Sequence, residues 1–268
     1  MAVDADAYLT RLGLDRAAVQ SLDRDALATL QRAHVTTVPF ETLAITGPPG
    51  DADGAGVSLA LTDLFEKLVR RERGGFCYEL NGLFGWLLGE LGYDVQRAAG
   101  RVLGGDETAF PPDNHLTNLV TLDRRYVVDV GVATPAIRRP LPIEGDVVED
   151  EAGIAWRVRP SDRDDADFRT EFRRPGRSSF EPRYVFADEP RALDSVASTC
   201  EYLATAPESP FTGEPFLTIA TPEGHLKLKE GTLSRSRGGE VTEEAVSDDE
   251  WATVVAAEFG VSLGTEEG

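Results

Sequence analysis

The stretch RGGFCYELNG, residues 73–82, places two glycines directly before Cys77 at the start of an amphipathic segment. The N-terminus of a helix presents free N–H groups and partial positive charge, and both stabilise a thiolate over a thiol. We therefore predict that Cys77 begins a helix, has a lowered pKa and can act as a nucleophile. The glycines allow a sharp turn and the close approach of a substrate. Free N–H groups beside the sulfur could also stabilise an oxyanion.

A thiolate nucleophile needs a base, and that base needs a group that orients it. His115 begins the strand-like run HLTNLV, and Asp129 follows the apolar residues YVV. A carboxylate that is buried needs a partner, and His115 is a suitable one. The two runs form a hairpin whose register the sequence leaves open. A turn centred on Arg124 would hold His115 and Asp129 apart, whereas one centred near Leu122 or Asp123 would bring them together.

The cysteines and histidines also have structural interpretations. Cys77 and Cys200 are the two cysteines of the chain, and each could fill the core, bind a metal or act as a nucleophile. Two cysteines are too few for a disulfide framework, and no CxxC or HxxxH spacing occurs, so we predict no metal site. We interpret Cys200 and His225 as structural residues, and His34 as a histidine packed at the end of a helix.

The predicted elements change in type along the chain. Helical periodicity and N-caps at Asp23, Thr62 and Ser247 predict helices at residues 8–12, 23–38, 62–73, 77–91 and 247–259. Alternating or β-branched runs predict strands at residues 95–102, 115–122, 126–130, 216–220 and 225–228. Helices therefore come first, then strands, then a mixed segment, and this order favours an α+β fold over alternating βαβ units.

The composition excludes several classes of function. The formal net charge is −20, so the surface repels phosphate backbones and we predict no nucleic-acid partner. No apolar run approaches the roughly 20 residues that span a bilayer, and the N-terminal residues lack a basic signal region, so we predict a cytoplasmic protein without membrane contact. Lysine occurs only at Lys67, Lys227 and Lys229, against 47 acidic residues. This balance predicts a halophilic protein in a high-salt cytoplasm, and the alternative is an ordinary acidic protein.

The segment around Cys77 resembles the active-site signature of the arylamine N-acetyltransferases. The run HVTTVPFETL at residues 34–43 resembles the helix-to-loop signature of that family. The runs DNHL at 113–116 and YVVDVG at 126–131 are similar to its histidine and aspartate segments, and residues 201–221 are similar to its third domain. The resemblance extends from about residue 8 to residue 233, which is most of the chain.

This resemblance implies a cysteine-protease-like core in three domains. They are an N-terminal helical bundle (1–91) with the nucleophile, a central antiparallel β-barrel (92–190) with the histidine and aspartate, and a C-terminal α/β lid (191–268). It also implies a catalytic triad in which Cys77 takes an acetyl group from acetyl-CoA as a thioester, His115 moves the proton and Asp129 holds the imidazole. An arylamine or arylhydrazine then accepts the acetyl group in a ping-pong reaction.

The same resemblance implies a structural ion pair between Glu41 and Arg73 near the site. No residue is assigned to CoA, but an acidic protein that binds this anion should have a local pocket of basic or N–H groups. Two positions depart from the family pattern. Val132 and Ala133 stand where the family often has Phe-Gly, and Thr42 stands where it usually has Asn. The first change removes an aromatic wall and should alter the acceptor pocket.

Three other functions are compatible with these motifs. A Cys-His-Asp triad also suits an amide or thioester hydrolase, or an amide synthase that uses a larger acyl donor. A binding domain without catalysis is the third, but binding alone does not require Cys77, His115 and Asp129 together. The oligomeric state is left open by the sequence.

Overall fold

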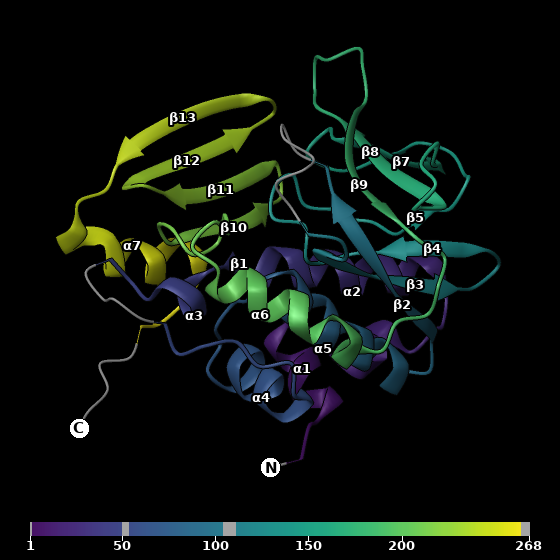
Figure 1. The fold of residues 1–268 in the computed structure, drawn as a ribbon, viewed down its shortest axis with the longest axis horizontal. Helices are drawn as coiled ribbons and strands as arrows, with labels where there is room; N and C mark the ends of the chain where they lie inside the picture. The colour runs from purple at the N-terminus through teal and green to yellow at the C-terminus, as the bar shows by residue number, and fades with distance from the viewer. Residues whose placement is uncertain (1, 50–53, 104–110, 264–268) are drawn as a thin grey trace.

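The computed structural model describes residues 2–49, 54–103 and 111–263. The fold has three parts, namely a helical layer, a β-barrel and a second sheet. Figure 1 shows a layer of helices below, a β-barrel at the upper right and a second sheet at the upper left. The α+β class with a nearly closed antiparallel barrel is confirmed. The domain limits at residues 91 and 190 stay predictions. No helix in the described ranges is both long and apolar enough to span a membrane.

The helical layer comes from the N-terminal third of the chain. Its helices are α1 (Ala5–Arg11), α2 (Arg24–Thr37), α3 (Leu43–Thr46), α4 (Leu61–Phe65) and α5 (Cys77–Glu90), with a 3₁₀ turn at Arg16–Val19 and a π-helical turn at Glu66–Arg70. Asp23 caps α2 as predicted, because its carboxylate accepts the N–H groups of residues 25 and 26. The predicted cap at Thr62 is wrong. Helix α4 already begins at Leu61, where the hydroxyl of Ser58 accepts the N–H of Ala60.

Helix α5 is the centre of this layer. It packs against α4 on one side and against two barrel strands, β2 (Asp94–Val102) and β3 (His115–Thr121), on the other. Its buried residues therefore surround the helix rather than form the single stripe that we expected, and Tyr78 and Leu83 are as inaccessible as Leu80 and Phe84. Gly92 follows the helix with φ 100°, a conformation that suits glycine after a helix end.

The barrel is one eight-stranded antiparallel sheet. Its strands are β2 (Asp94–Val102), β3 (His115–Thr121), β4 (Arg125–Val128), β5 (Leu141–Pro142), β6 (Val148–Glu149), β7 (Ala155–Pro160), β8 (Phe168–Arg173) and β9 (Glu181–Phe186). Their spatial order is β5-β4-β3-β2-β9-β8-β7-β6. Strands β5 and β7 also contact one another, so the sheet nearly closes on itself. Trp156, Phe172, Tyr184 and Phe186 are among the side chains that fill its interior.

The hairpin of β3 and β4 adopts one of the two favourable registers. Val120 pairs with Tyr126 and Thr121 with Arg125, which centres the turn on Asp123. His115 and Asp129 consequently lie at the same end of the hairpin. Asp129 directly follows β4, whereas the predicted strand at 126–130 included it.

The third part is a five-stranded sheet with two helices. It contains β1 (Phe40–Glu41), β10 (Phe216–Thr221), β11 (Gly224–Lys229), β12 (Thr232–Arg237) and β13 (Glu240–Ala245), preceded by a 3₁₀ turn at Leu193–Val196 and α6 (Ala197–Thr205) and followed by α7 (Asp248–Phe259). Ser247 and Glu250 form the predicted capping box. Trp251 and Phe259 of α7 belong to the apolar cluster that covers one face of this sheet. Strand β1 pairs with β10, so the segment before α3 joins this sheet.

Candidate active site

The chain reaches Cys77 through a tightly packed loop. Cys77 is the first residue of α5 and is only 3% exposed. A Cβ on Gly74 would lie 2.3 Å from the carbonyl oxygen of Pro39, so glycine is needed there for close approach. The left-handed residue of the loop is Glu72, with φ 51°, and neither glycine before Phe76 has a positive φ. The Phe76 N–H is capped by the Glu79 carboxylate at 3.1 Å.

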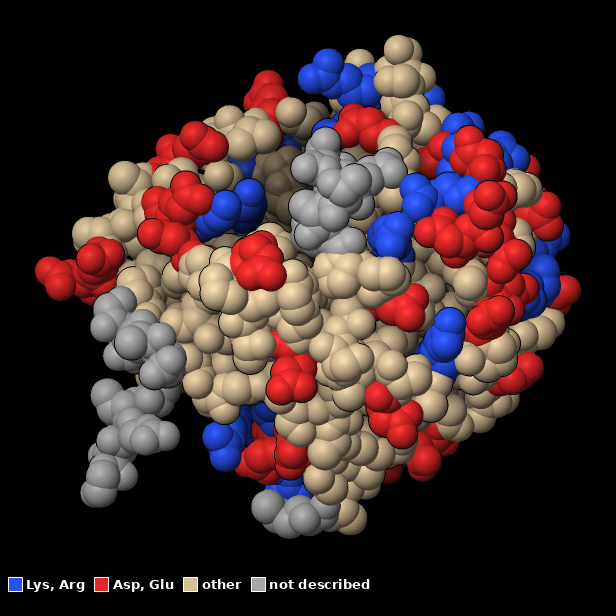
Figure 2. Space-filling model, in the orientation of Figure 1, with Lys and Arg blue, Asp and Glu red and all other residues tan. Residues whose placement is uncertain are grey.

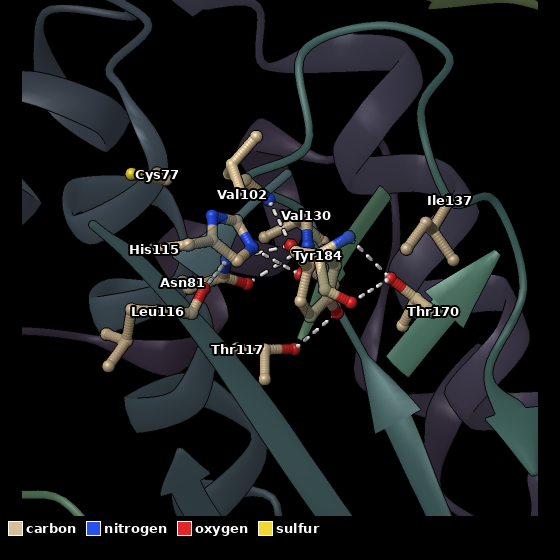
Figure 3. A network of polar contacts seen from close by, with 12 residues as sticks. Cys77, Asn81, Val102, His115, Leu116, Thr117, Val130, Ile137, Thr170 and Tyr184 are labelled. Carbon is tan, nitrogen blue, oxygen red and sulfur yellow. Dashed lines mark hydrogen bonds and ion pairs between the residues drawn. The ribbon is translucent and has the colours of Figure 1, made fainter. Parts of the chain in front are cut away.

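His115 and Asp129 form a direct hydrogen bond. The His115 Nε2 lies 2.7 Å from Asp129 Oδ2, and both side chains are almost inaccessible to solvent. The second oxygen, Oδ1, accepts hydrogen bonds from the Asn81 amide at 2.9 Å and the Gly131 N–H at 2.8 Å. An ionised carboxylate only accepts, so Nε2 carries the proton and Nδ1 is left as the basic nitrogen. Figure 3 shows the imidazole between Cys77 and this network.

Asn81 connects the elements that carry the three residues. It lies one turn after Cys77 on α5, and besides Asp129 its amide donates to the Leu116 carbonyl at 2.6 Å. Its oxygen accepts the Val130 N–H at 3.0 Å. A Cβ on Gly131 would lie 2.5 Å from the Asn81 amide nitrogen, so the strand end can approach α5 only with glycine there. Asn81 was not predicted to belong to the site, although its i+4 spacing from Cys77 places both residues on one face of the helix.

The ring of Tyr184 supports the other side of the imidazole. Its centroid lies 4.6 Å from that of His115, and its hydroxyl donates to Thr117 at 3.2 Å. Tyr184 belongs to β9, which pairs with β2 beside the histidine strand. Nothing in the sequence pointed to this residue, because the contact depends on how the barrel closes.

Burial raises the pKa of both the Cys77 thiol and the Asp129 carboxyl group, and hydrogen bonds lower it. Burial raises the pKa of the Cys77 thiol, Cys200 and Asp129 add to this, and the N–H of Tyr78 opposes it. The expectation of a lowered pKa, which considered only the helix N-terminus, is therefore wrong for this thiol. Burial would also raise the pKa of Asp129, but His115 and Asn81 overcome that effect and hold it below its usual value. The carboxylate is thus ionised next to a neutral thiol.

Cys77 and His115 line one cavity of about 330 Å³ between the barrel and the five-stranded sheet. Figure 2 shows this face hollowed at its upper centre, with basic side chains at the rim and acidic ones scattered over the remaining surface, most densely at the right. Arg183, Lys227 and Lys229 are the basic residues of its lining. The described residues contain no cluster of three or more His, Cys, Asp or Glu side chains that could bind a metal ion.

One wall of the cavity is aromatic. Phe40, Phe211 and Phe216 line it, and the ring of Phe216 stacks on that of Phe40 with centroids 5.4 Å apart. Val132 and Ala133 lie in the same lining, so the departure from the family pattern does fall in the pocket. These two positions carry no aromatic side chain, and the aromatic surface of the cavity comes instead from Phe40 on β1, Phe216 on β10 and Phe211 in the loop before β10. These phenylalanines are far apart in the sequence, and no local pattern predicts that they meet.

The remaining residues singled out from the sequence lie outside this cavity. Glu41 is fully buried and binds Arg73 at 3.1 Å, so the expected ion pair is present. His34 packs edge-on against the rings of Tyr8 and Phe84, and burial lowers its pKa to about 3. Cys200 is buried on α6, and His225 is half-buried on β11.

Comparison with known proteins identifies the family of this chain. A family model described as N-acetyltransferase matches residues 23–267. The arylamine N-acetyltransferase of Mycolicibacterium smegmatis is 33% identical over an alignment of 273 positions, which covers 98% of this chain and 94% of that protein. The chain belongs to the arylamine N-acetyltransferase family.

Solved structures of this family share the whole fold. The M. smegmatis arylamine N-acetyltransferase structure has a TM-score of 0.85 at 32% identity and covers 100% of this chain and 95% of its own. The arylamine N-acetyltransferase of Mycobacterium marinum, solved in complex with CoA, has a TM-score of 0.82 at 29% identity, covering 96% and 93%. The three-part fold of this arylamine N-acetyltransferase is therefore that of its relatives.

Proposed function

We propose that this protein transfers an acetyl group from acetyl-CoA to an arylamine or arylhydrazine through a thioester on Cys77. The observation that carries the proposal is the pairing of Asp129, at 2.7 Å, with His115, which lines the same cavity as Cys77. The names of the relatives and the CoA bound to the M. marinum enzyme support the same reaction.

In the first half-reaction His115 Nδ1 accepts the thiol proton of Cys77. Since burial raises the pKa of that thiol, the thiolate forms as a buried ion pair with the imidazolium, which Asp129 stabilises. The thiolate attacks the carbonyl carbon of acetyl-CoA, and free N–H groups at the start of α5 stabilise the oxyanion. The bond from carbon to the CoA sulfur then breaks, and CoA leaves with the proton from His115.

In the second half-reaction the amine nitrogen attacks the acetyl-Cys77 carbonyl. His115 takes the proton from that nitrogen, the thiolate of Cys77 is expelled and the amide product leaves. The phenylalanines of the cavity wall offer flat surfaces against which an aromatic acceptor can stack. Because the first product leaves before the acceptor reacts, the kinetics should be ping-pong.

Lys227 is the residue that we propose for the phosphates of CoA. Of the three lysines, Lys67 binds Glu79 and Lys229 binds the neighbouring Glu230. Lys227 forms no ion pair within the described parts of the chain, and it faces the cavity from β11. A basic side chain kept free in so acidic a protein suits an anionic substrate.

We also propose a cytoplasmic, halophilic protein. Both cysteines are free thiols, as a reducing compartment would keep them. The net charge of −20 supports a high-salt environment, where screening weakens the self-repulsion.

Mass spectrometry of the intact protein in high salt tests the reaction. Brief incubation with acetyl-CoA should add one acetyl group on Cys77, and p-anisidine should remove it. The adduct should be absent in Cys77→Ala and present in Cys200→Ala, which removes the other buried thiol. Release of CoA without an amine would favour the hydrolase. Neither adduct nor release would indicate another acyl donor or a binding function.

A further inference from the structure

One segment of the barrel connects the candidate triad to the five-stranded sheet. It runs from Asp129, directly after β4, to Arg138, shortly before β5, and residues 131–134 within it line the cavity. A side chain of α2 holds both of its ends, because the Gln31 amide donates to the Asp129 carbonyl at 3.2 Å and to the Ile137 carbonyl at 2.7 Å. Ile137 also belongs to the apolar core of the barrel. The end that carries Arg138 is therefore fixed to both the helical layer and the barrel.

The side chain of Arg138 reaches from this segment to the sheet. It is only 2% exposed, and one guanidinium nitrogen binds the Asp150 carboxylate at 2.8 Å. Another nitrogen donates to the carbonyls of Thr221 and Gly224, which are the last residue of β10 and the first of β11. The second carboxylate oxygen of Asp150 accepts two N–H groups of the loop before β7. A buried ion pair of the barrel thus holds the turn between β10 and β11.

The other end of β10 has a separate attachment. There β10 pairs with β1, with Thr218 opposite Phe40 and Leu217 opposite Glu41. Strands β11, β12 and β13 lie beyond β10 in the sheet, and the cavity residues Lys227 and Lys229 are on β11. Parts of a chain that meet at a small interface move relative to one another by default. An attachment at each end of β10 opposes rotation of the sheet, whereas an attachment at one end alone does not.

We propose that Arg138 is a positioning residue, which holds the wall formed by β10 and β11 at the distance from Cys77 that acetyl-CoA binding requires. This inference rests on the proposed acetyl transfer. A buried ion pair adds little stability relative to apolar side chains of the same volume. The planar guanidinium instead supplies several hydrogen bonds in fixed directions, here to one carboxylate and two carbonyls. Geometry rather than stability is therefore what the arginine provides.

The adjacent ion pair offers a matched control. Arg139 binds Glu151 at 2.6 Å, so each member of this pair follows a member of the buried pair in the sequence. The Arg139 side chain is 45% exposed, and its hydrogen bond in the described part of the chain is to Glu151 and not to the sheet. Arg139→Met should therefore leave acetyl-CoA binding unchanged.

Single-turnover acetylation without an acceptor tests the proposal. The double variant Arg138→Met/Asp150→Asn removes the attachment and leaves no unpaired buried charge, and the new amide oxygen can still accept the N–H groups of the loop. The acetyl-CoA concentration for half-maximal rate should rise about 10- to 100-fold. The maximal rate and the alkylation of Cys77 by iodoacetamide depend on the triad and should change less than about threefold. Arg138→Lys keeps the charge without the planar fork and should show a smaller rise of the same kind.

Hydrogen exchange measures the attachment directly. The amides of residues 221–224 should exchange faster in the double variant than in the wild type, and Arg139→Met should leave their exchange unchanged. This measurement needs no substrate. It therefore reports on the attachment even if the wild type accepts no acetyl group from acetyl-CoA, a result that would refute the proposed function.

Three results would overturn the inference. Wild-type half-saturation and exchange in the double variant would show that the sheet is held without Arg138. Recovery of both acetyl-CoA binding and the urea midpoint in the double variant, after their loss in Arg138→Met, would reduce the role of Arg138 to neutralising Asp150. A parallel loss of acetylation and alkylation would mean that the substitution acts on the triad.

Discussion

Replacement of Asn81 by alanine tests how the site is held together. The side chain is fully buried, and it joins α5 to the Leu116 carbonyl, the Val130 N–H and the Asp129 carboxylate. Alanine leaves the first two groups without this partner, and each unsatisfied buried group costs about 1–3 kcal/mol. Allowing for some relaxation, we expect Asn81→Ala to lower the free energy of unfolding by about 2–4 kcal/mol. Urea unfolding at pH 7 measures this loss.

The same substitution should impair catalysis through Asp129. The Asn81 hydrogen bond helps hold the pKa of Asp129 below its usual value, so its loss raises that pKa. A carboxyl group whose pKa is lowered on folding stabilises the protein at pH values above its unfolded pKa of about 4. This stabilisation is lost as the pH falls through the pKa of the folded state. Asn81→Ala should therefore lose activity and stability at a higher pH on the acid side than the wild type. At pH 7 a misoriented imidazole should lower kcat/KM for acetyl-CoA by roughly 10- to 100-fold.

Asn118 provides the matched control. It is equally buried and donates to the backbone and side-chain oxygens of Asn81, at 3.1 and 3.3 Å, and it does not hydrogen-bond Asp129, which is also a described residue. Asn118→Ala should thus destabilise the protein but shift neither the acid limb nor kcat/KM by more than a few fold. If the two variants lose activity in proportion to stability, or if Asn81→Ala keeps the wild-type acid limb, Asn81 does not position Asp129.

Three further changes have distinct expected results. Arg73→Met leaves the buried Glu41 carboxylate unpaired and should cost about 3–5 kcal/mol in chemical unfolding, and a loss below 1 kcal/mol would contradict a buried pair. Lys227→Gln should raise KM for acetyl-CoA, with a larger effect at low salt, and should leave kcat/KM for p-nitrophenyl acetate unchanged. An equal effect on both donors would show that Lys227 does not bind the phosphates. The Tm of the wild type should rise between low and molar salt, and a flat response would reject the halophilic interpretation.

Local signals predicted the elements well where one residue determines the backbone. Asp23 caps α2 because its short carboxylate side chain accepts free N–H groups of the helix start. At the start of α7 the Glu250 carboxylate accepts the N–H and the hydroxyl of Ser247. The same reasoning failed at Thr62, because the hydroxyl of Ser58 accepts the N–H of Ala60, the residue directly before Leu61, and the helix starts earlier than predicted. A cap is selected by the geometry of the preceding loop as well as by residue type.

The site was predictable only as far as its three central side chains. Their types and order suggested a triad. The register centred on Asp123, which brings His115 and Asp129 to the same end of the hairpin, was one of several that the sequence allowed. Tyr184, Arg183 and Phe216 reach the cavity from strands that lie close to His115 only after the barrel closes and the second sheet packs. Periodicity along the chain carries no information on such long-range contacts.

Cys77 shows most clearly why a local rule is insufficient. The start of a helix favours a thiolate, but that benefit is small when the sulfur is almost entirely buried and buried carboxylates lie nearby. A lone thiolate would therefore be unfavourable, whereas a thiolate beside an imidazolium forms a neutral pair that Asp129 extends. It follows that replacing His115 should suppress the thiolate itself as well as the proton transfer. Reaction of Cys77 with a neutral alkylating agent should then slow to nearly the same extent as acetylation.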